Sequence, residues 1–241
     1  MRIIKKSELK GILVLIGIAL VISAGLYLLT HPVIRFYEPL SNKIVFVSDR
    51  SGHQNIWVMD PDGSNQKPLT NGVYTDAEPV VSPDGYTIAF VSKRGTPHSQ
   101  IYCMDSNGAH QHRITNSTGS KSAPRFTADG KNIIFMCGGE VWMVSTHGNR
   151  MERLLPTEKE AALARMDGTK SSYVWADISP DGKMIAAIRS LGDTQLAVWL
   201  KAGDEVPSPI AQMIPDVGPV QLTGEKLSCA WSSNQKLAIT L

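Results

Sequence analysis

The chain has 241 residues, of which 42% are hydrophobic and 19% charged, a balance typical of folded rather than disordered proteins. A single repeat system fills this length, so one domain with an appendage is expected. The formal net charge of +2 reflects a basic start, and the rest of the chain is close to neutral. A near-neutral domain gives no electrostatic reason to expect nucleic acid as a partner.

Residues 11–30 form a long apolar segment that follows a basic stretch at residues 1–10. A helix of this length spans a hydrocarbon core of about 30 Å at about 1.5 Å per residue. The basic stretch predicts a single-pass helix in the bacterial inner membrane, with a cytoplasmic amino terminus and a periplasmic domain. The alternative is a signal peptide cleaved near Ser23, although the apolar run continues past that site. Both interpretations place the domain outside the cytoplasm, with residues 31–38 as a juxtamembrane linker.

One motif recurs along residues 39–241, a polar turn between two short apolar runs with strand character. Its clearest copy is Ser82-Pro83-Asp84-Gly85. The proline pre-sets φ, the aspartate bonds nearby backbone, and the glycine takes the positive φ that closes the turn. The turns begin at residues 41, 82, 127, 179 and 232. The predicted turn residues are Asp84, Gly85, Asp129, Gly130, Asp181 and Gly182.

A second half accompanies each of the first three turns, a strand of alternating faces that runs into another glycine turn. Trp57, Tyr102 and Trp142 occupy one equivalent position in these strands. We expect the three aromatic side chains to pack between neighbouring sheets. Four strands per unit of roughly 40–50 residues predict an all-β propeller. We expect four full blades and a partial fifth, preceded by the transmembrane helix.

The blocks Ser-Pro-Asp-Gly-x-x-Ile-Ala-Phe-Val-Ser and Ile-Trp-Val-Met-Asp-Pro-Asp-Gly resemble the repeats of TolB-type β-propellers. The resemblance extends over about residues 39–241 and implies the propeller fold. Propellers of this type are protein-binding parts of envelope machinery, so the resemblance also implies protein partners. The chain departs from TolB itself, because it has the apolar segment in place of a separate amino-terminal domain.

The repeat is interrupted after the third unit. Residues 157–167 have the pattern of a short helix, with Thr157 as its cap, a glutamate three residues later and Asp167-Gly168 at its end. A proline-rich tail at residues 202–219 extends the fourth unit. Insertions in repeat proteins often lie on the binding face, and a surface excursion without a role is the alternative.

The last unit contains only two of the four strands expected for a blade. Either the chain is a fragment of a longer propeller, or the half blade is completed in another way. A partner protein that pairs with the open strand edge is one such way.

No residue is predicted to be catalytic, to bind a cofactor or to bind a metal. The chain contains no Gly-x-Ser-x-Gly nucleophile elbow. Asp60 and Asp62 resemble a calcium loop but lack its closing glutamate, so a turn is the favoured interpretation. His110 and His112 put two imidazoles on one side of an extended segment, which suits zinc, yet no further ligand lies nearby in sequence.

The three cysteines, Cys103, Cys137 and Cys229, lie in or beside strands of different units. Their odd number and the absence of a Cys-x-x-Cys motif favour buried free thiols over a zinc site or a redox pair.

Two classes of function remain. The favoured one is a non-catalytic, membrane-anchored scaffold that binds other membrane or periplasmic proteins through the anchor helix and the propeller loops. An accessory subunit of a respiratory, photosynthetic or secretory membrane complex fits this class, with lipid around the helix. The other is an enzyme or small-ligand receptor that uses the central channel. Such sites need several acids or histidines on the innermost strands, where we expect only Glu78, Arg125 and Asp177.

Overall fold

The computed structural model describes residues 37–148, 150–169, 172–191, 194–201, 204, 208–209, 221–223, 228–231 and 237–240. The chain divides into two compact units, residues 1–37 and 38–241, and the described strands belong to the second. The predicted anchor at 11–30 and the basic start lie outside the described residues. Within the part that is described, no helix is both long and apolar enough to cross a membrane.

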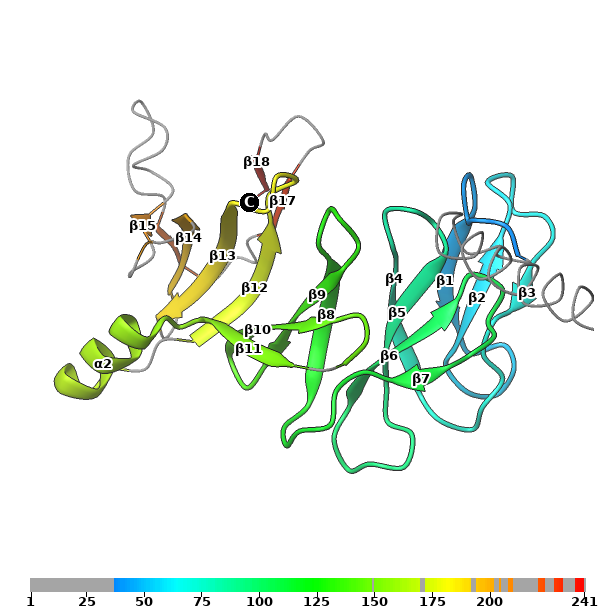
Figure 1. Cartoon of the computed structure of the whole chain (residues 1–241), viewed down its shortest axis with the longest axis horizontal. Helices are drawn as coiled ribbons and strands as arrows, with labels where there is room; N and C mark the ends of the chain where they lie inside the picture. Colours follow the sequence, from blue (N-terminus) through cyan, green and yellow to red (C-terminus); the bar gives the residue numbers. More distant parts are fainter. Residues whose placement is uncertain are drawn as a thin grey trace, which may run out of the picture. The chain divides into compact units, whose positions relative to one another are not determined.

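The described strands form successive antiparallel sheets (Figure 1). The first sheet has the order β1-β2-β3, with β1 at Ile44–Ser48, β2 at Asn55–Met59 and β3 at Lys67–Pro68. The second has the order β4-β5-β6-β7, with β4 at Asp76–Val81, β5 at Thr87–Ser92, β6 at Gln100–Asp105 and β7 at His112–Arg113. The third runs β11-β10-β9-β8, with β8 at Lys121–Phe126, β9 at Asn132–Cys137, β10 at Glu140–Ser145 and β11 at Met151–Leu155.

The fourth sheet is built on β12 at Ser172–Ile178, β13 at Met184–Leu191 and β14 at Thr194–Lys201. Two short strands, β15 at Ser208–Pro209 and β16 at Gln221–Thr223, both pair with β14. A two-stranded sheet follows, with β17 at Ser228–Trp231 and β18 at Leu237–Thr240. The predicted all-β, antiparallel fold is confirmed. The blade count stays a prediction, since the first sheet has three described strands and the fourth has five.

Apolar cores join neighbouring sheets because successive side chains of a strand point to opposite faces. On β5, Ile88 and Phe90 pack into the core shared with the first sheet, while Ala89 and Val91 pack into the core shared with the third. Burial on both faces explains why β5 reads as a continuous apolar run rather than an alternating one. A further core joins the third and fourth sheets and comprises Met136, Val141, Leu155, Tyr173, Ala176, Ala187, Val198 and Leu200.

The three repeated aromatic residues differ in what covers them. Tyr102 lies in the core between the first and second sheets, and Trp142 packs against the core between the second and third. Val58 faces the second sheet, so its neighbour Trp57 faces the opposite side of the first sheet. The described residues place no sheet on that side. In the described structure, Trp57 therefore does not pack between two sheets, although this was expected of all three aromatic side chains.

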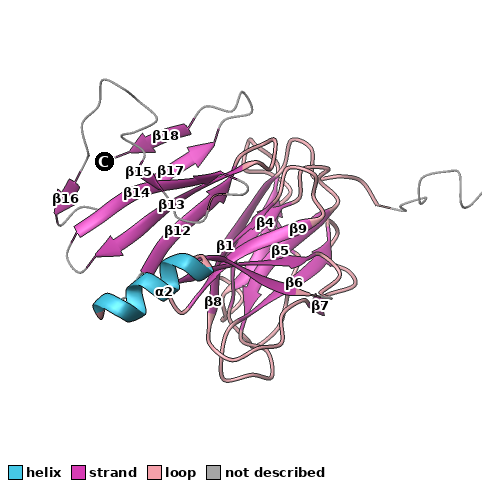
Figure 2. Cartoon of the chain, turned by 60° about the vertical axis from the view of Figure 1, so that its left-hand side comes forward, coloured by secondary structure: helices cyan, strands magenta, loops and turns pink. Residues whose placement is uncertain are grey.

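The predicted helical insertion is confirmed as α2, Glu158–Asp167, which follows β11 and precedes β12 in the chain (Figure 2). The Thr157 hydroxyl accepts a hydrogen bond from the Glu160 N–H at 3.2 Å, and Gly168 ends the helix with φ +72°. The Glu160 carboxylate is buried, and the Tyr173 hydroxyl of β12 donates to it at 2.7–2.8 Å. Arg189 of β13 completes an ion pair with it at 3.4 Å. The helix is thus attached to the fourth sheet.

Candidate functional site

The predicted turn residues lie in three turns of one design. In the second sheet, the Ser82 hydroxyl donates to Asp84 Oδ1 at 2.6 Å, and the same oxygen accepts the Tyr86 N–H at 3.0 Å. Equivalent bonds tie Asp129 to Thr127 and Lys131, and Asp181 to Ser179 and Lys183. Gly85, Gly130 and Gly182 have φ of +75°, +68° and +71°, a region that glycine adopts without steric cost.

Local hydrogen bonds keep the turn carboxylates charged. The Thr127 hydroxyl and the Lys131 N–H lower the pKa of Asp129 below its ordinary value. The Ser179 hydroxyl and the Lys183 N–H do the same for the pKa of Asp181. Hydrogen bonds donated to a carboxylate favour its ionised form. Both carboxylates, which are ionised at neutral pH even at the ordinary aspartate pKa, therefore stay ionised to a lower pH.

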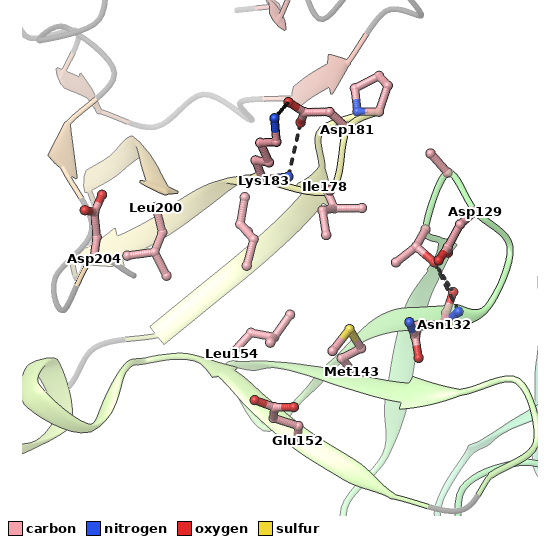
Figure 3. Close-up of a pocket in the computed structure, with 15 residues that line it drawn as sticks. Asp129, Asn132, Met143, Glu152, Leu154, Ile178, Asp181, Lys183, Leu200 and Asp204 are labelled. Carbon is pink, nitrogen blue, oxygen red and sulfur yellow. Dashed lines mark hydrogen bonds and ion pairs between the residues drawn. The ribbon is translucent and has the colours of Figure 1, made fainter. Parts of the chain in front are cut away.

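A groove of about 570 Å³ lies between the third and fourth sheets, at the end where the Asp129 and Asp181 turns stand (Figure 3). Met143 and Leu154 point into it from the third sheet, and Ile178 points into it from the fourth (Figure 3). These side chains give the groove an apolar floor. It can accept an apolar side chain of a ligand.

The rim of the groove is acidic. Asp129, Glu152, Asp181 and Asp204 line it, and Lys183 is the one basic residue among the described residues that do so. The Lys183 ammonium stands 3.8 Å from Asp181 and its side chain is 72% exposed, so this ion pair is weak. Such a rim favours a ligand that carries basic groups beside its apolar side chain.

The residues considered for calcium serve the turn between β2 and β3. Asp60 accepts a hydrogen bond from Asn65 at 2.6 Å and pairs with Lys43, and both contacts lower its pKa. The Ser64 hydroxyl donates to Asp62 at 2.7 Å and lowers the pKa of that carboxyl. No group of three or more metal-ligating side chains occurs in the described parts of the chain.

The two histidines do not have the geometry on which the zinc hypothesis rested. His110 has φ +52° and lies in the turn after β6, so the segment is not extended at that residue. Its imidazole contacts Asp105, and His112 Nδ1 contacts the His110 carbonyl at 2.8 Å. Asn65 has the same conformation in the first sheet, with φ +53°, which marks this as a repeated turn position.

Cys103 is buried between the second and third sheets, and burial raises the pKa of its thiol to about 12. Cys137 is half-buried, with its Sγ 3.8 Å from the Thr118 carbonyl. Both are free thiols. The side chain of Cys229 lies outside the described set.

The charged residues expected near a central channel are tied to backbone groups. Glu78 accepts the Ala123 N–H of the neighbouring sheet, and both residues have φ +50° where the strand register shifts. Arg125 donates to the Pro124 carbonyl at 2.9 Å, and Asp177 accepts the Ile178 N–H at 2.9 Å. These contacts favour a structural role for Glu78 at a β-bulge.

Sequence reasoning missed the groove. Met143 and Leu154 lie in ordinary strand patterns, and nothing local distinguishes them from core residues. The only sequence signal was the interruption of the repeat at residues 157–167, which marked the boundary where the groove lies. The turn aspartates were identified as structural residues, and the structure additionally places two of them at the rim.

Comparison with known proteins agrees with this architecture. The family model of the TolB beta propeller domain, PD40, matches residues 31–160, more than half of the chain. The Protein TolB homolog of Chlorobaculum tepidum is 46% identical over 48 residues, which are 20% of this chain and 11% of that protein.

Two solved structures share the fold. TolB from Acinetobacter baumannii has a TM-score of 0.59 at 24% identity, over 80% of this chain and 44% of that one. The putative TolB from Agrobacterium tumefaciens has a TM-score of 0.58 at 16% identity, over 76% of this chain and 62% of that one. The chain thus spans less than two thirds of each of these relatives. On the family match and the repeated sheets together, the chain belongs to the TolB β-propeller domain family.

Proposed function

We propose that this chain is a non-catalytic interaction module whose groove between the third and fourth sheets binds a segment of a partner protein. The observation that carries the proposal is the combination of an apolar floor, with Met143 and Leu154, and a rim of carboxylates. Apolar anchors in a pocket supply affinity, and complementary charges supply specificity and association rate. The partner segment therefore presents an apolar side chain next to lysine or arginine.

Membership of the TolB propeller family supports this class of function, because TolB-like proteins interact with other proteins. The tethered variant is part of the same proposal: residues 11–30 anchor the domain in the inner membrane, facing the periplasm, as an accessory subunit of a membrane complex. The apolar composition of that segment supports it. Retention of the full chain in membranes after carbonate extraction is expected. Release would contradict the tether and leave the groove proposal standing.

The groove is tested by photo-crosslinking in the cells that make the protein. A photoreactive p-benzoyl-phenylalanine replaces Lys183, which lines the rim. A matched chain carries it at Lys93, an exposed lysine at the end of β5 away from the groove. We expect one dominant protein adduct from position 183 and none from position 93. Equal labelling from both positions, or no protein adduct from either, would contradict the proposal.

A further inference from the structure

An arginine packed on two aromatic rings recurs in the first and second sheets. In the second sheet, the Arg94 guanidinium lies 5.3 Å from the Phe90 ring centroid and 5.5 Å from that of Tyr102. Its Nε donates to Asp76 at 3.3 Å, and its Nη2 also pairs with that buried carboxylate. Its Nη1 donates to Gln111. The cation is thus stacked, oriented by an amide and neutralised by an acid.

In the first sheet, Arg50 repeats every part of this arrangement except the acid. Its guanidinium lies 5.4 Å from the Phe46 ring and 4.8 Å from the Trp57 ring. Its Nε donates to the Ser48 hydroxyl at 2.8 Å, and its Nη1 donates to Gln66, as Arg94 does to Gln111. Among the ion pairs of the described residues, none includes Arg50.

The acids near Arg50 in sequence do not fill this role. Asp49, the adjacent exposed residue, makes no ion pair with it among the described contacts. In the sequence, residues 30–37 contain no aspartate or glutamate. Glu38 lines the cavity between the first and second sheets, on the other face of the first sheet.

The third sheet also places a carboxylate at this cluster, and there the carboxylate accepts a hydrogen bond from the aromatic residue. Trp142 Nε1 donates to the Glu140 carboxylate at 3.0 Å, and Arg153 pairs with the other oxygen at 3.3 Å. Trp57 is the equivalent residue of the first sheet, and its Nε1 is buried with no hydrogen-bond partner. A buried donor without a partner costs free energy. Two sister sheets therefore hold a carboxylate at this cluster, while among the described residues no carboxylate pairs with Arg50 or with Trp57 Nε1 in the first sheet.

We propose that Arg50 is a binding site for a carboxylate of a partner protein, an aspartate or glutamate side chain flanked by apolar residues. The proposal rests on the scaffold function above and adds a second contact surface. Ile44, 39% exposed, and the half-buried Phe46 lie on the same face of β1 and supply the apolar neighbourhood. Ser48 and Gln66 hold the planar guanidinium in place, so less freedom is lost when a carboxylate binds two of its N–H groups. A single arginine beside Asp49 suits one carboxylate better than a surface of anionic lipids, which attracts clusters of basic residues.

The experiment uses the full chain in detergent micelles with ¹⁵N-labelled arginine, and follows the Nε–Hε signals by NMR. The Arg50 signal is assigned by its loss in Arg50→Lys. Two blocked peptides serve as probes, acetyl-Leu-Asp-Val-amide and acetyl-Leu-Asn-Val-amide. We expect the aspartyl peptide to shift the Arg50 signal to saturation and to bind at least ten-fold more tightly than the asparaginyl peptide. Arg113→Lys, a change at an exposed arginine of β7, should leave that shift unchanged.

Equal binding of the two peptides, or an Arg50 signal that neither peptide moves, would overturn the inference. Vesicles containing phosphatidylglycerol supply the lipid arm, and a larger Arg50 response to vesicles than to the aspartyl peptide would also overturn it. Crosslinking from position 183 in Arg50→Lys separates the two proposals. If that adduct persists while the peptide test fails, the carboxylate-site proposal is rejected and the groove proposal is retained.

Discussion

The contact between the second and third sheets and the contact between the third and fourth use the same turn with different results. At the first contact, a Cβ added to Gly130 would lie 3.7 Å from Pro83, within van der Waals contact, so the two turns lie close together. At the second, a Cβ on Gly182 would meet nothing within 4 Å, and the groove opens there. The two glycines have nearly equal φ, +68° and +71°. The conformation of the turns therefore does not explain why one contact is close and the other is open. The different spacing of the sheets explains it.

The connections between the sheets differ in the way this spacing requires. A short loop, residues 114–120, joins the second sheet to the third, whereas residues 156–171, which include α2, join the third to the fourth. The helix packs on the fourth sheet through buried Glu160. Because this longer connection packs on the fourth sheet by itself, it does not draw the turns of the third and fourth sheets into contact. We infer that the insertion permits the groove.

The largest effect should come from crowding the closely packed contact. A Cβ on Gly148, which has φ +74°, would stand 2.8 Å from the Ile114 carbonyl oxygen across the second and third sheets. Strain and overpacking together should lower the free energy of unfolding of Gly148→Ala by about 3 kcal/mol. Gly63→Ala is the matched control, because Gly63 occupies the same turn position with φ +85° and open space around it. Urea denaturation that gives equal losses for both would contradict the close contact.

Loosening the helix should have the next largest effect. Tyr173→Phe removes the hydroxyl that donates to the buried Glu160 carboxylate, so the free energy of unfolding should fall by about 1.5–3 kcal/mol. Glu158→Gln is the control, since that carboxylate is exposed in its pair with Arg153 and should contribute about 0–1 kcal/mol. Equal losses in the two variants, measured by urea denaturation, would mean that the Glu160 cluster does not hold the helix.

The same tyrosine predicts an alkaline limit to stability. Burial, and then the Glu160 carboxylate, raise the pKa of Tyr173 above its ordinary value. The unfolded chain therefore loses this proton first, at a pH of about 10, and the stabilisation is lost as the pH rises further. Melting temperatures between pH 9 and pH 11 should fall less steeply in Tyr173→Phe than in the unaltered chain. Parallel curves would contradict the assignment.

The smallest expected effect is on the melting temperature at low pH. The pKa of Asp129 is lowered in the folded chain by Thr127 and Lys131, so its stabilising contribution is present above the ordinary aspartate pKa and is lost as the pH falls below about 4. The melting temperature of Asp129→Asn should therefore decline less between pH 5 and pH 2 than that of the unaltered chain. Lys131→Gln keeps the backbone N–H and serves as a control with nearly normal acid dependence. An identical decline in Asp129→Asn would show that the turn does not lower the pKa of Asp129.

Turns and strands could be predicted from the sequence because their causes are local. Proline, aspartate and glycine at successive positions specify the turn at Gly85, and the hydroxyl of Ser82 is two residues from the carboxylate that it contacts. The helix at 157–167 was predicted for the same reason, since its cap and its end lie in adjacent residues.

Features that depend on distant residues could not be predicted. The pattern suggested Glu160 as a capping-box partner, yet the burial of its carboxylate against Tyr173 depends on how α2 docks on the fourth sheet. Gly130 and Gly182 stand in near-identical sequences, and only the spacing of the sheets decides which turn lies close to its neighbour. The groove follows from that spacing, so its floor had no local signature.

The most direct test of the account is the yield of the adduct from position 183 when the groove is blocked. Leu154→Glu puts a charge on the apolar floor, and Leu163→Glu puts the same charge on an exposed leucine of α2, 48% exposed. With both variants folded by circular dichroism, we expect Leu154→Glu to abolish the adduct and Leu163→Glu to retain it. An undiminished adduct in folded Leu154→Glu would contradict the claim that the groove between the third and fourth sheets binds the partner.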